Sequence, residues 1–313
     1  MEEFIMAFTA KDVQALREKT GVGMMECKKA LVETDGDMDK AIDVLRERGL
    51  ASSAKKSSRV AAEGVVVAYN DKAKKVAALV EVNCETDFVA KNPKFVELAN
   101  AVAKTVVDEN PADVDALLKT TISGGNNTVE EAVQELFLAI RENMKVRRFV
   151  RKETVAETYI HAGGTVGVMV EFDTDDATAA KPEFSEMGKD VAMQVAAMSP
   201  LYLDAASVPA EVLEHEKSIL IAQMKEDPKM ANKPEQVLAK IVDGKIGKYY
   251  KENCLVEQAF VKDGDINVAT YVANCAKKLG AEIKLVGFTR FAKGEGIEKK
   301  EENFAAEIAS MIK

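Results

Sequence analysis

The chain has 313 residues, of which 47% are hydrophobic and 30% are charged, and its 43 basic and 52 acidic side chains give a net charge of −9. This length favours about two domains with apolar cores, and the acidic balance argues against a nucleic-acid-binding surface over the whole protein. With 2 histidines and 4 cysteines, none of them in a CxxC pair, zinc sites and histidine-based hydrolase triads are disfavoured.

The sequence carries no evident targeting or membrane segment. No run approaches the roughly 18 apolar residues of a transmembrane helix, and the acidic N-terminus lacks the basic start of a signal peptide. Met6 is an alternative start residue, in which case residues 1–5 are an addition. Because the thiols are also scattered, we expect a soluble cytoplasmic protein without cofactor or metal, with no membrane partner and no direct nucleic-acid partner.

The N-terminal segment predicts three short helices that pack as a small bundle. Thr9 with Asp12 marks the first start, the second helix covers about 24–33, and Asp37 caps a third helix that ends at Gly49. Each helix is too short to be stable alone, so the three must pack together. A module of this size usually serves in tethering or binding.

A change of periodicity follows. Residues 51–59 are small, polar and basic, which is typical of a linker. A strand at 64–69, a turn and a second strand at 75–83 are then predicted from their β-forming residues. Phe95 recurs with Val102 at helical spacing after them, which predicts an amphipathic helix.

The same pattern returns later in the chain, where a strand is predicted at 165–172. Residues 80–83 align with 170–173, and residues 93–95 align with 182–184, each followed by an amphipathic helix. Internal duplication and two unrelated α+β units with similar local patterns both explain this match. We favour duplication because the match spans a hairpin, a loop and a helix, and two long repeats are too few for a solenoid.

The remaining segments are mostly helical. Thr128 and Glu131 form a capping box between the repeats. The five basic residues of 145–152 are interpreted as the C-terminal end of a helix, where positive charges interact favourably with the helix dipole. Residues 209–250 predict two antiparallel helices that project from the body, joined by a proline-containing turn. The chain then predicts a helix at 268–279, a strand at 282–291, a glycine turn at 294–296 and a last helix at 302–313.

Few patterns carry chemistry. The glycine-rich run 163–167 precedes a strand and opens no helix, so it predicts a hairpin turn and not a phosphate cradle. Asp173, Asp175 and Asp176 have no second cluster to complete a metal shell, so we expect them to be solvated. The sequence thus offers no catalytic constellation.

Phe88 is the candidate binding residue. It follows a strand and is flanked by Asp87 and Val89. An aromatic side chain in a loop beside a charge is a candidate anchor for a partner. The alternative is that Phe88 packs under the following helix, and its position in the sequence leaves both open.

Three stretches of the chain resemble bacterial elongation factor Ts, the family of guanine nucleotide exchange factors for elongation factor Tu. They occur in the family's order, and the resemblance as a whole extends from Phe8 to the end of the chain. The stretches are LREKTGVGMMECKKAL at 16–31, EVNCETDFVA at 81–90, and GFTRF at 287–291 with GEGIE at 294–298 and FAAE at 304–307.

The resemblance implies an α+β fold built from a bundle similar to a ubiquitin-associated (UBA) domain, two related α+β core subdomains, a protruding helical hairpin and a C-terminal helical module. The implied division is 1–54 for the UBA-like domain, 55–146 for the linker and first core subdomain, 147–208 and 255–292 for the second core subdomain, 209–254 for the hairpin and 293–313 for the C-terminal module.

The resemblance also implies a role without covalent chemistry. The segment Thr86, Asp87, Phe88 and Val89 would enter the region of the partner's nucleotide site, where Phe88 wedges into an apolar pocket and magnesium coordination is lost. Further implied contacts with elongation factor Tu are Met25, Lys28, Lys56, Ile140, His161 and Val261. Lys262 follows Val261 where an apolar residue is expected, and this departure weakens the Val261 assignment.

Two alternatives come from other classes of protein. One is an enzyme that uses the acidic loop and His161. The sequence offers no complementary base, nucleophile or metal shell for such an enzyme. The other is an interaction adaptor that uses only the UBA-like bundle and has no exchange activity. The adaptor alternative leaves the segment 86–89 without a role.

Overall fold

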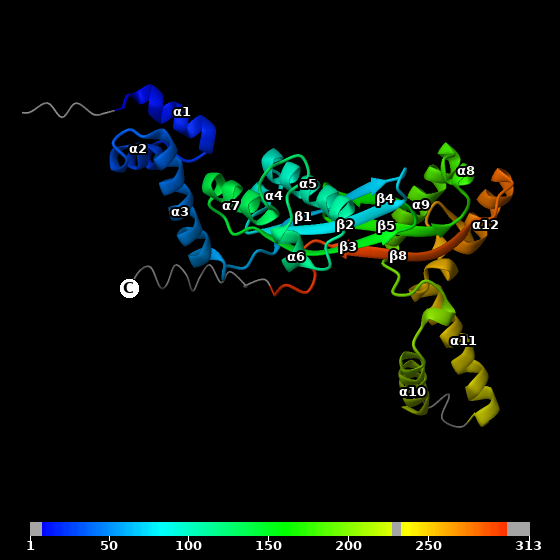
Figure 1. Cartoon of the computed structure of the whole chain (residues 1–313). Helices are drawn as coiled ribbons and strands as arrows, with labels where there is room; N and C mark the ends of the chain where they lie inside the picture. Colours follow the sequence, from blue (N-terminus) through cyan, green and yellow to red (C-terminus); the bar gives the residue numbers. More distant parts are fainter. Residues whose placement is uncertain (1–7, 227–232, 299–313) are drawn as a thin grey trace, which may run out of the picture.

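The computed structural model describes residues 8–226 and 233–298. Its helices and small antiparallel sheets confirm the mixed α+β class. The described residues form an N-terminal helical bundle, a central body of two sheets flanked by helices, and a helical hairpin that points away from the body (Figure 1).

The N-terminal bundle is closed by one buried leucine from each helix. Leu16, Leu31 and Leu45 are at most 1% exposed. The predicted helix start at Thr9 and Asp12 is confirmed, and the two residues form a capping box. The helices are α1 (Ala10–Thr20), α2 (Met24–Glu33) and α3 (Met38–Lys56).

Helix α3 is longer than predicted. It does not end at Gly49, and residues 51–56 continue it, so both the helix end and that part of the linker were wrong. At Gly49 the helix crosses α7 (Val129–Ile140), where a Cβ atom would lie 1.9 Å from Cδ2 of Leu138. Glycine is therefore needed for the close approach and not for a cap. Leu138 in turn packs in the core of the bundle.

The first unit of the body is an antiparallel sheet in the order β1-β2-β3 with helices on one face. Val65 packs toward the helices and Val66 toward the opposite face, as the alternation of a strand requires. Its further elements are β1 (Glu63–Asp71), β2 (Val76–Cys84), α4 (Asp87–Ala90), α5 (Pro93–Glu109), α6 (Val114–Lys119) and β3 (Lys145–Glu153). The capping box of Thr128 and Glu131 starts α7 as predicted.

The basic residues of 145–152 lie on strand β3, so the predicted helix end was wrong. Helix α7 ends before them, and β3 pairs with β2 through a register shift beside Glu81. The extra residue on β3 lets both Arg147 and Arg148 reach the Glu81 carboxylate, at N–O distances of 3.0 and 2.6 Å. Because Glu81 is 0% exposed, these charges serve a buried ion pair and not a helix dipole.

The second unit has a sheet in the order β4-β5-β8 and repeats the local order of the first. In both units the central strand is followed by a helix of 4 residues and then by a helix of 17 residues that starts with proline. The predicted strand at 165–172 and the helix at 268–279 are confirmed. The elements are β4 (Val155–His161), β5 (Val166–Asp173), α8 (Asp176–Ala179), α9 (Pro182–Met198), η1 (Ala205–Ser207), η2 (Leu255–Glu257), β6 (Ala259–Phe260), β7 (Asp263–Asn267), α12 (Val268–Leu279) and β8 (Lys284–Ala292).

The projecting hairpin consists of α10 (Ala210–Glu226) and α11 (Glu235–Asn253), as the sequence predicted (Figure 1). Met224, Val242 and Ile246 form a small buried cluster between the two helices. The glycine turn follows β8 at 293–296. The last predicted helix, 302–313, and the alternative start Met6 lie outside the described residues.

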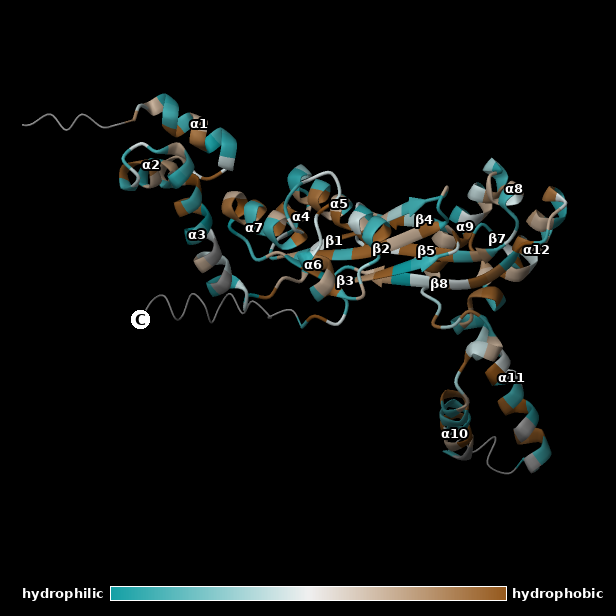
Figure 2. Cartoon of the chain, viewed as in Figure 1, coloured by the Kyte–Doolittle hydropathy of each residue, from teal (hydrophilic) through white to brown (hydrophobic). Residues whose placement is uncertain are grey.

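The two sheets pack against each other through their inner faces. Val66, Ala77 and Leu79 of the first sheet form one buried cluster with Ala156 and Met169 of the second. Hydrophobic residues accordingly run along the central strands of both units (Figure 2). The outer faces are left for helices, α5 and α7 on the first unit and α9 and α12 on the second.

Close contact between the sheets depends on glycine in the run 163–167. The Val66 N–H donates to the Gly164 carbonyl at 2.8 Å. A Cβ atom on Gly167 would lie 2.4 Å from Cγ1 of Val66. The predicted hairpin turn is confirmed, and its glycines also make room for the opposite sheet.

We predict that Gly167→Ala destabilises the protein by about 1–3 kcal/mol, because the added methyl group overpacks the contact with Val66. Urea unfolding measures this change. Gly264→Ala is the matched control, since Gly264 also lies in a strand but a Cβ atom added there would meet nothing within 4 Å. Equal stability of the two variants would contradict the tight sheet contact.

Candidate partner-binding site

Phe88 points away from the body on the one-turn helix α4 and is 82% exposed. Its neighbours Val89 and Ala90 are each 7% exposed and pack in the core of the first unit. The alternative in which Phe88 packs under the following helix is therefore excluded. A large apolar side chain left this exposed on an ordered turn is a candidate anchor for a partner.

Helix α4 is held in place by a carboxylate from another part of the chain. Glu142 accepts the backbone N–H of Thr86 at 3.0 Å and the Thr86 hydroxyl at 2.7 Å. Thr86 is also the N-cap of α4, where its Oγ1 accepts the Val89 N–H at 3.4 Å. Next to it, Glu85 Oε1 accepts the Asn143 N–H at 2.6 Å.

Two titratable groups flank the turn. Lys91 donates to the Asp87 carboxylate at 2.7 Å, and this hydrogen bond holds the pKa of Asp87 below its usual range. Burial raises the pKa of the Cys84 thiol to about 12, with the nearby carboxylates of Glu142 and Glu63 adding to the effect. Asp87 is therefore a carboxylate at neutral pH, and Cys84 is an inert thiol.

Met25 and Lys28 lie on the exposed side of α2. Met25 is 64% exposed, and Val32 on the same helix is 54% exposed. These residues border a shallow recess of about 430 Å³ that is completed by Lys29, Glu33 and Arg48. The bundle thus offers an apolar and basic surface, separate from the Phe88 turn.

Lys56 and Ile140 already have contacts within the protein. The Lys56 ammonium donates to the Arg141 carbonyl at 2.5 Å and lies 5.9 Å from the ring centroid of Phe137. Ile140 is half-buried against the core of the first unit. Their contacts with a partner stay predictions.

His161 and Val261 lie on the second unit. His161 is exposed at the end of β4, where the Tyr159 hydroxyl lies 3.0 Å from its Nδ1 atom. Val261 is 45% exposed between β6 and β7. Lys262, which departs from the expected apolar residue, donates to Asp190 at 2.6 Å. The structure therefore brings Lys56 and Ile140 close to the segment that anchors α4, and leaves His161 and Val261 on the other unit.

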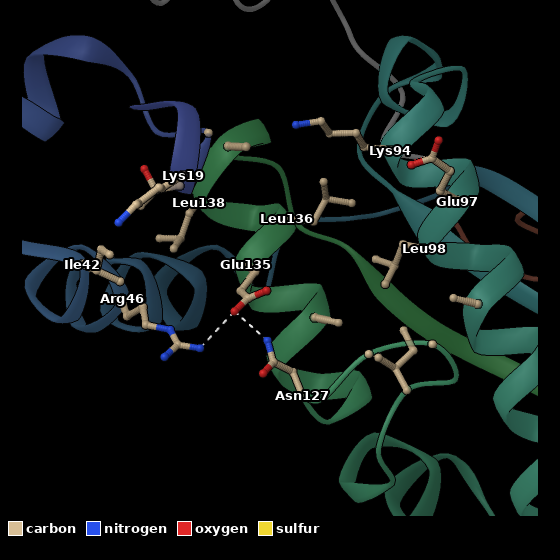
Figure 3. Close-up of a pocket in the computed structure, with 18 of the residues that line it drawn as sticks. Lys19, Ile42, Arg46, Lys94, Glu97, Leu98, Asn127, Glu135, Leu136 and Leu138 are labelled. Carbon is tan, nitrogen blue, oxygen red and sulfur yellow. Dashed lines mark hydrogen bonds and ion pairs between the residues drawn. The ribbon is translucent and has the colours of Figure 1, made fainter. Parts of the chain in front are cut away.

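A groove of about 760 Å³ separates the bundle from the first unit (Figure 3). Glu135 bridges it, accepting from Arg46 at 2.9 Å and from Asn127 at 2.7 Å. Leu98 and Leu136 line the groove beside charges of both signs. These features describe a polar bridge between two parts of the protein rather than a pocket shaped for a ligand.

Glu85, Glu142 and Asn143 were missed by sequence reasoning. Glu85 lies inside the stretch that resembles the family, but Glu142 and Asn143 follow the end of α7 with no motif of their own. Their role depends on contacts 56 and 58 residues away in sequence. No local pattern reports contacts of that kind.

Within 8–226 and 233–298, no group of three or more His, Cys, Asp or Glu side chains is arranged to hold a metal ion. Over the same residues, no helix is long and apolar enough to span a membrane. The features that stand out are the exposed aromatic on an anchored turn and the apolar surface of α2. Together they are the candidate surfaces for contact with another protein.

Comparison with known proteins identifies the family. The model of the family described as elongation factor Ts matches residues 85–295. Elongation factor Ts of Clostridium perfringens is 50% identical over 306 residues, which cover 97% of this chain and 98% of the relative. Elongation factor Ts of Clostridium botulinum is 47% identical over 307 residues, covering 97% and 99%. The chain belongs to the elongation factor Ts family of translation factors.

We predict that native protein treated with iodoacetamide at pH 8 is labelled at Cys275 and not at Cys84. Cys275 is half-buried, whereas Cys27, Cys84 and Cys254 are buried. With a pKa of about 12 for Cys84, only about one thiol in 10⁴ is a thiolate at pH 8. Peptide mass spectrometry locates the label, and urea-unfolded protein is the control in which all four thiols react. Equal labelling of Cys84 and Cys275 in native protein would contradict the environment described for α4.

Proposed function

We propose that the protein is a guanine nucleotide exchange factor that binds elongation factor Tu·GDP and promotes release of GDP, so that GTP can bind. The observation that carries this proposal is Phe88, which is 82% exposed on a helix of four residues that other parts of the chain hold in place. Membership of the elongation factor Ts family supports the choice of partner.

The proposed mechanism needs no covalent chemistry. Phe88 enters an apolar pocket of the partner's GTPase domain, and the Asp87 carboxylate lies beside it. This disturbs the partner's phosphate site and its magnesium, and loss of the magnesium removes much of the electrostatic grip on the nucleotide. The exchange factor binds the nucleotide-free partner more tightly than the nucleotide-bound partner, and the coupling is reciprocal.

The energy available from Phe88 fits part of this task. Each tenfold weakening of GDP binding requires about 1.4 kcal/mol of differential interaction. A buried aromatic at the centre of an interface supplies roughly 2–4 kcal/mol. The rest is distributed over Met25 and Lys28 on the bundle, Lys56 and Ile140 near α4, and His161 and Val261 on the second unit.

The division of the chain into domains follows from the same proposal. The bundle acts as the UBA-like domain that grips the partner, and the two units of the body are the related core subdomains. The repeated order of a 4-residue helix and a 17-residue helix supports a common origin of the two units. The hairpin of α10 and α11 is a separate projecting arm.

We predict that the protein accelerates release of labelled GDP from purified elongation factor Tu, and that Phe88→Ala lowers the rate by about 30-fold, equivalent to about 2 kcal/mol at a hot spot. Stopped-flow fluorescence measures the rate. Val286→Ala is the control, because Val286 is also exposed, at 41%, but lies on β8 outside the proposed contacts. If the wild-type protein leaves GDP release unchanged, the proposed function is wrong.

We predict smaller losses, of no more than about fivefold, for Asp87→Ala and His161→Ala. Both side chains are exposed, and exposed polar and charged groups contribute about 0.2–1 kcal/mol to a contact. The same GDP-release assay measures both variants. Full activity in both would show that these two residues are wrongly assigned as contacts, while the Phe88 result would be unaffected.

A further inference from the structure

The segment 141–143, between α7 and β3, touches both the turn that carries Phe88 and the chain that leaves the N-terminal bundle. We propose that Glu142 and Asn143 are positioning residues, which hold the Phe88 helix at a fixed place relative to the bundle. This inference rests on the proposed exchange function, since it assigns these residues to the presentation of Phe88.

The segment is hydrogen-bonded to the N-terminus of α4. Glu142 uses both carboxylate oxygens on Thr86, one for the backbone N–H and one for the hydroxyl. Hydrogen bonds to a charged acceptor are the stronger kind, and a pair of them fixes orientation as well as distance. The segment also donates a hydrogen bond, from the Asn143 N–H to the Glu85 carboxylate. A helix of 4 residues is unstable alone, so its position depends on these bonds and on the burial of Val89 and Ala90.

The same segment also binds the chain that leaves the bundle after α3. Asn143 is 5% exposed, and its side-chain amide donates to the Ser57 and Arg59 carbonyls at 3.3 and 2.8 Å. Lys145 donates to the same Ser57 carbonyl at 2.7 Å. Arg59 also pairs with Glu85 at 3.3 Å. The chain just after α3 is therefore bonded to the residues that anchor α4.

The segment itself is attached firmly by the helix before it. Helix α7 places Phe137 in the core of the first unit and the adjacent Leu138 in the core of the bundle. The helix ends at Ile140 and is capped by Arg141, whose φ of 65° is left-handed and whose carbonyl accepts a hydrogen bond from the Lys56 ammonium. Two cores thus fix the residue that precedes Glu142. The segment therefore connects the chain that leaves the bundle to the helix that carries Phe88.

The consequence is preorganisation. A partner that contacts both the bundle and Phe88 meets them at a set spacing, so the cost of ordering the turn is met during folding and not during binding. Loss of the Glu142 bonds leaves the surface of the bundle intact but lets α4 move. The exchange step then suffers more than the initial association.

The test uses the full-length protein with Glu142→Ala and Glu142→Gln in the GDP-release assay, over a range of protein concentrations. We expect Glu142→Ala to lower the maximal rate about tenfold and to change the half-saturating concentration less than twofold. Glu142→Gln keeps one acceptor oxygen and should recover part of the rate. A merely destabilised protein would instead show a higher half-saturating concentration with the maximal rate retained. Glu109→Ala, which removes an exposed carboxylate at the far end of α5, is the control.

Two further measurements distinguish a failure of the positioning role from a failure of the proposed exchange function. In a Phe88→Ala background, Glu142→Ala should cause no additional loss, because both changes remove the same contact. In the free protein, amide hydrogen exchange at Val89 and Ala90 should be about tenfold faster in Glu142→Ala than in the wild type. The positioning role would be overturned if Glu142→Ala kept the full maximal rate or left hydrogen exchange unchanged. It would also be overturned if the rate losses of Glu142→Ala and Phe88→Ala multiplied in the double variant. Absence of exchange activity in the wild type would overturn the proposed function, and the hydrogen-exchange result alone would then decide the inference.

Discussion

The fold depends on how closely the two sheets approach each other. Val66 faces Gly167 across the interface, where a Cβ atom would lie 2.4 Å from the valine, and its N–H bonds to Gly164. Two sheets that meet this closely share one apolar layer, so each must bury its outer face under helices. Helix α5 does this on the first unit and helix α9 on the second. The arrangement puts α4, which precedes α5, at the edge of the body, where Phe88 can be exposed.

A buried carboxylate joins the units a second time. Burial of Glu81 acts to raise its pKa, but hydrogen bonds from the Gly294 N–H, Arg148, Asn83 and Arg147 outweigh it, and the net pKa is lowered. The Gly294 N–H lies 2.7 Å from Glu81 Oε1, so this charge ties the turn after β8 to the first sheet. A lowered pKa means that the group stabilises the fold at neutral pH and that this contribution is lost as the pH falls through the folded-state value. Removing the carboxylate would leave two guanidinium groups without their shared partner.

Local chemistry explains what the sequence could predict. Both capping boxes, the strand at 165–172 and the helix at 268–279 are set by neighbouring residues, and all were confirmed. The errors came from distant contacts. The basic run at 145–152 is a strand that pairs with β2, and two of its arginines contact Glu81, 66 and 67 residues away. Gly49 lies within α3, where the helix closely approaches Leu138. For the same reason, residues 86–89 could be singled out, but the exposure of Phe88 and its anchoring by Glu142 could not be predicted.

The corresponding one-turn helices α4 and α8 make different contacts in the two units. In both, an N-cap side chain accepts an N–H three residues later and opens a one-turn helix, with Thr86 in the first unit and Asp175 in the second. The residue after the first helical position is Phe88 in the first unit and Ala177 in the second. In the second unit, an ion pair between Asp176 and Lys75 links that turn to the first unit. In the first unit, the corresponding Asp87 pairs with Lys91 of its own loop. The first turn is instead bonded to another part of the chain through Glu142, which contacts Thr86 and leaves the aromatic side chain open to a partner.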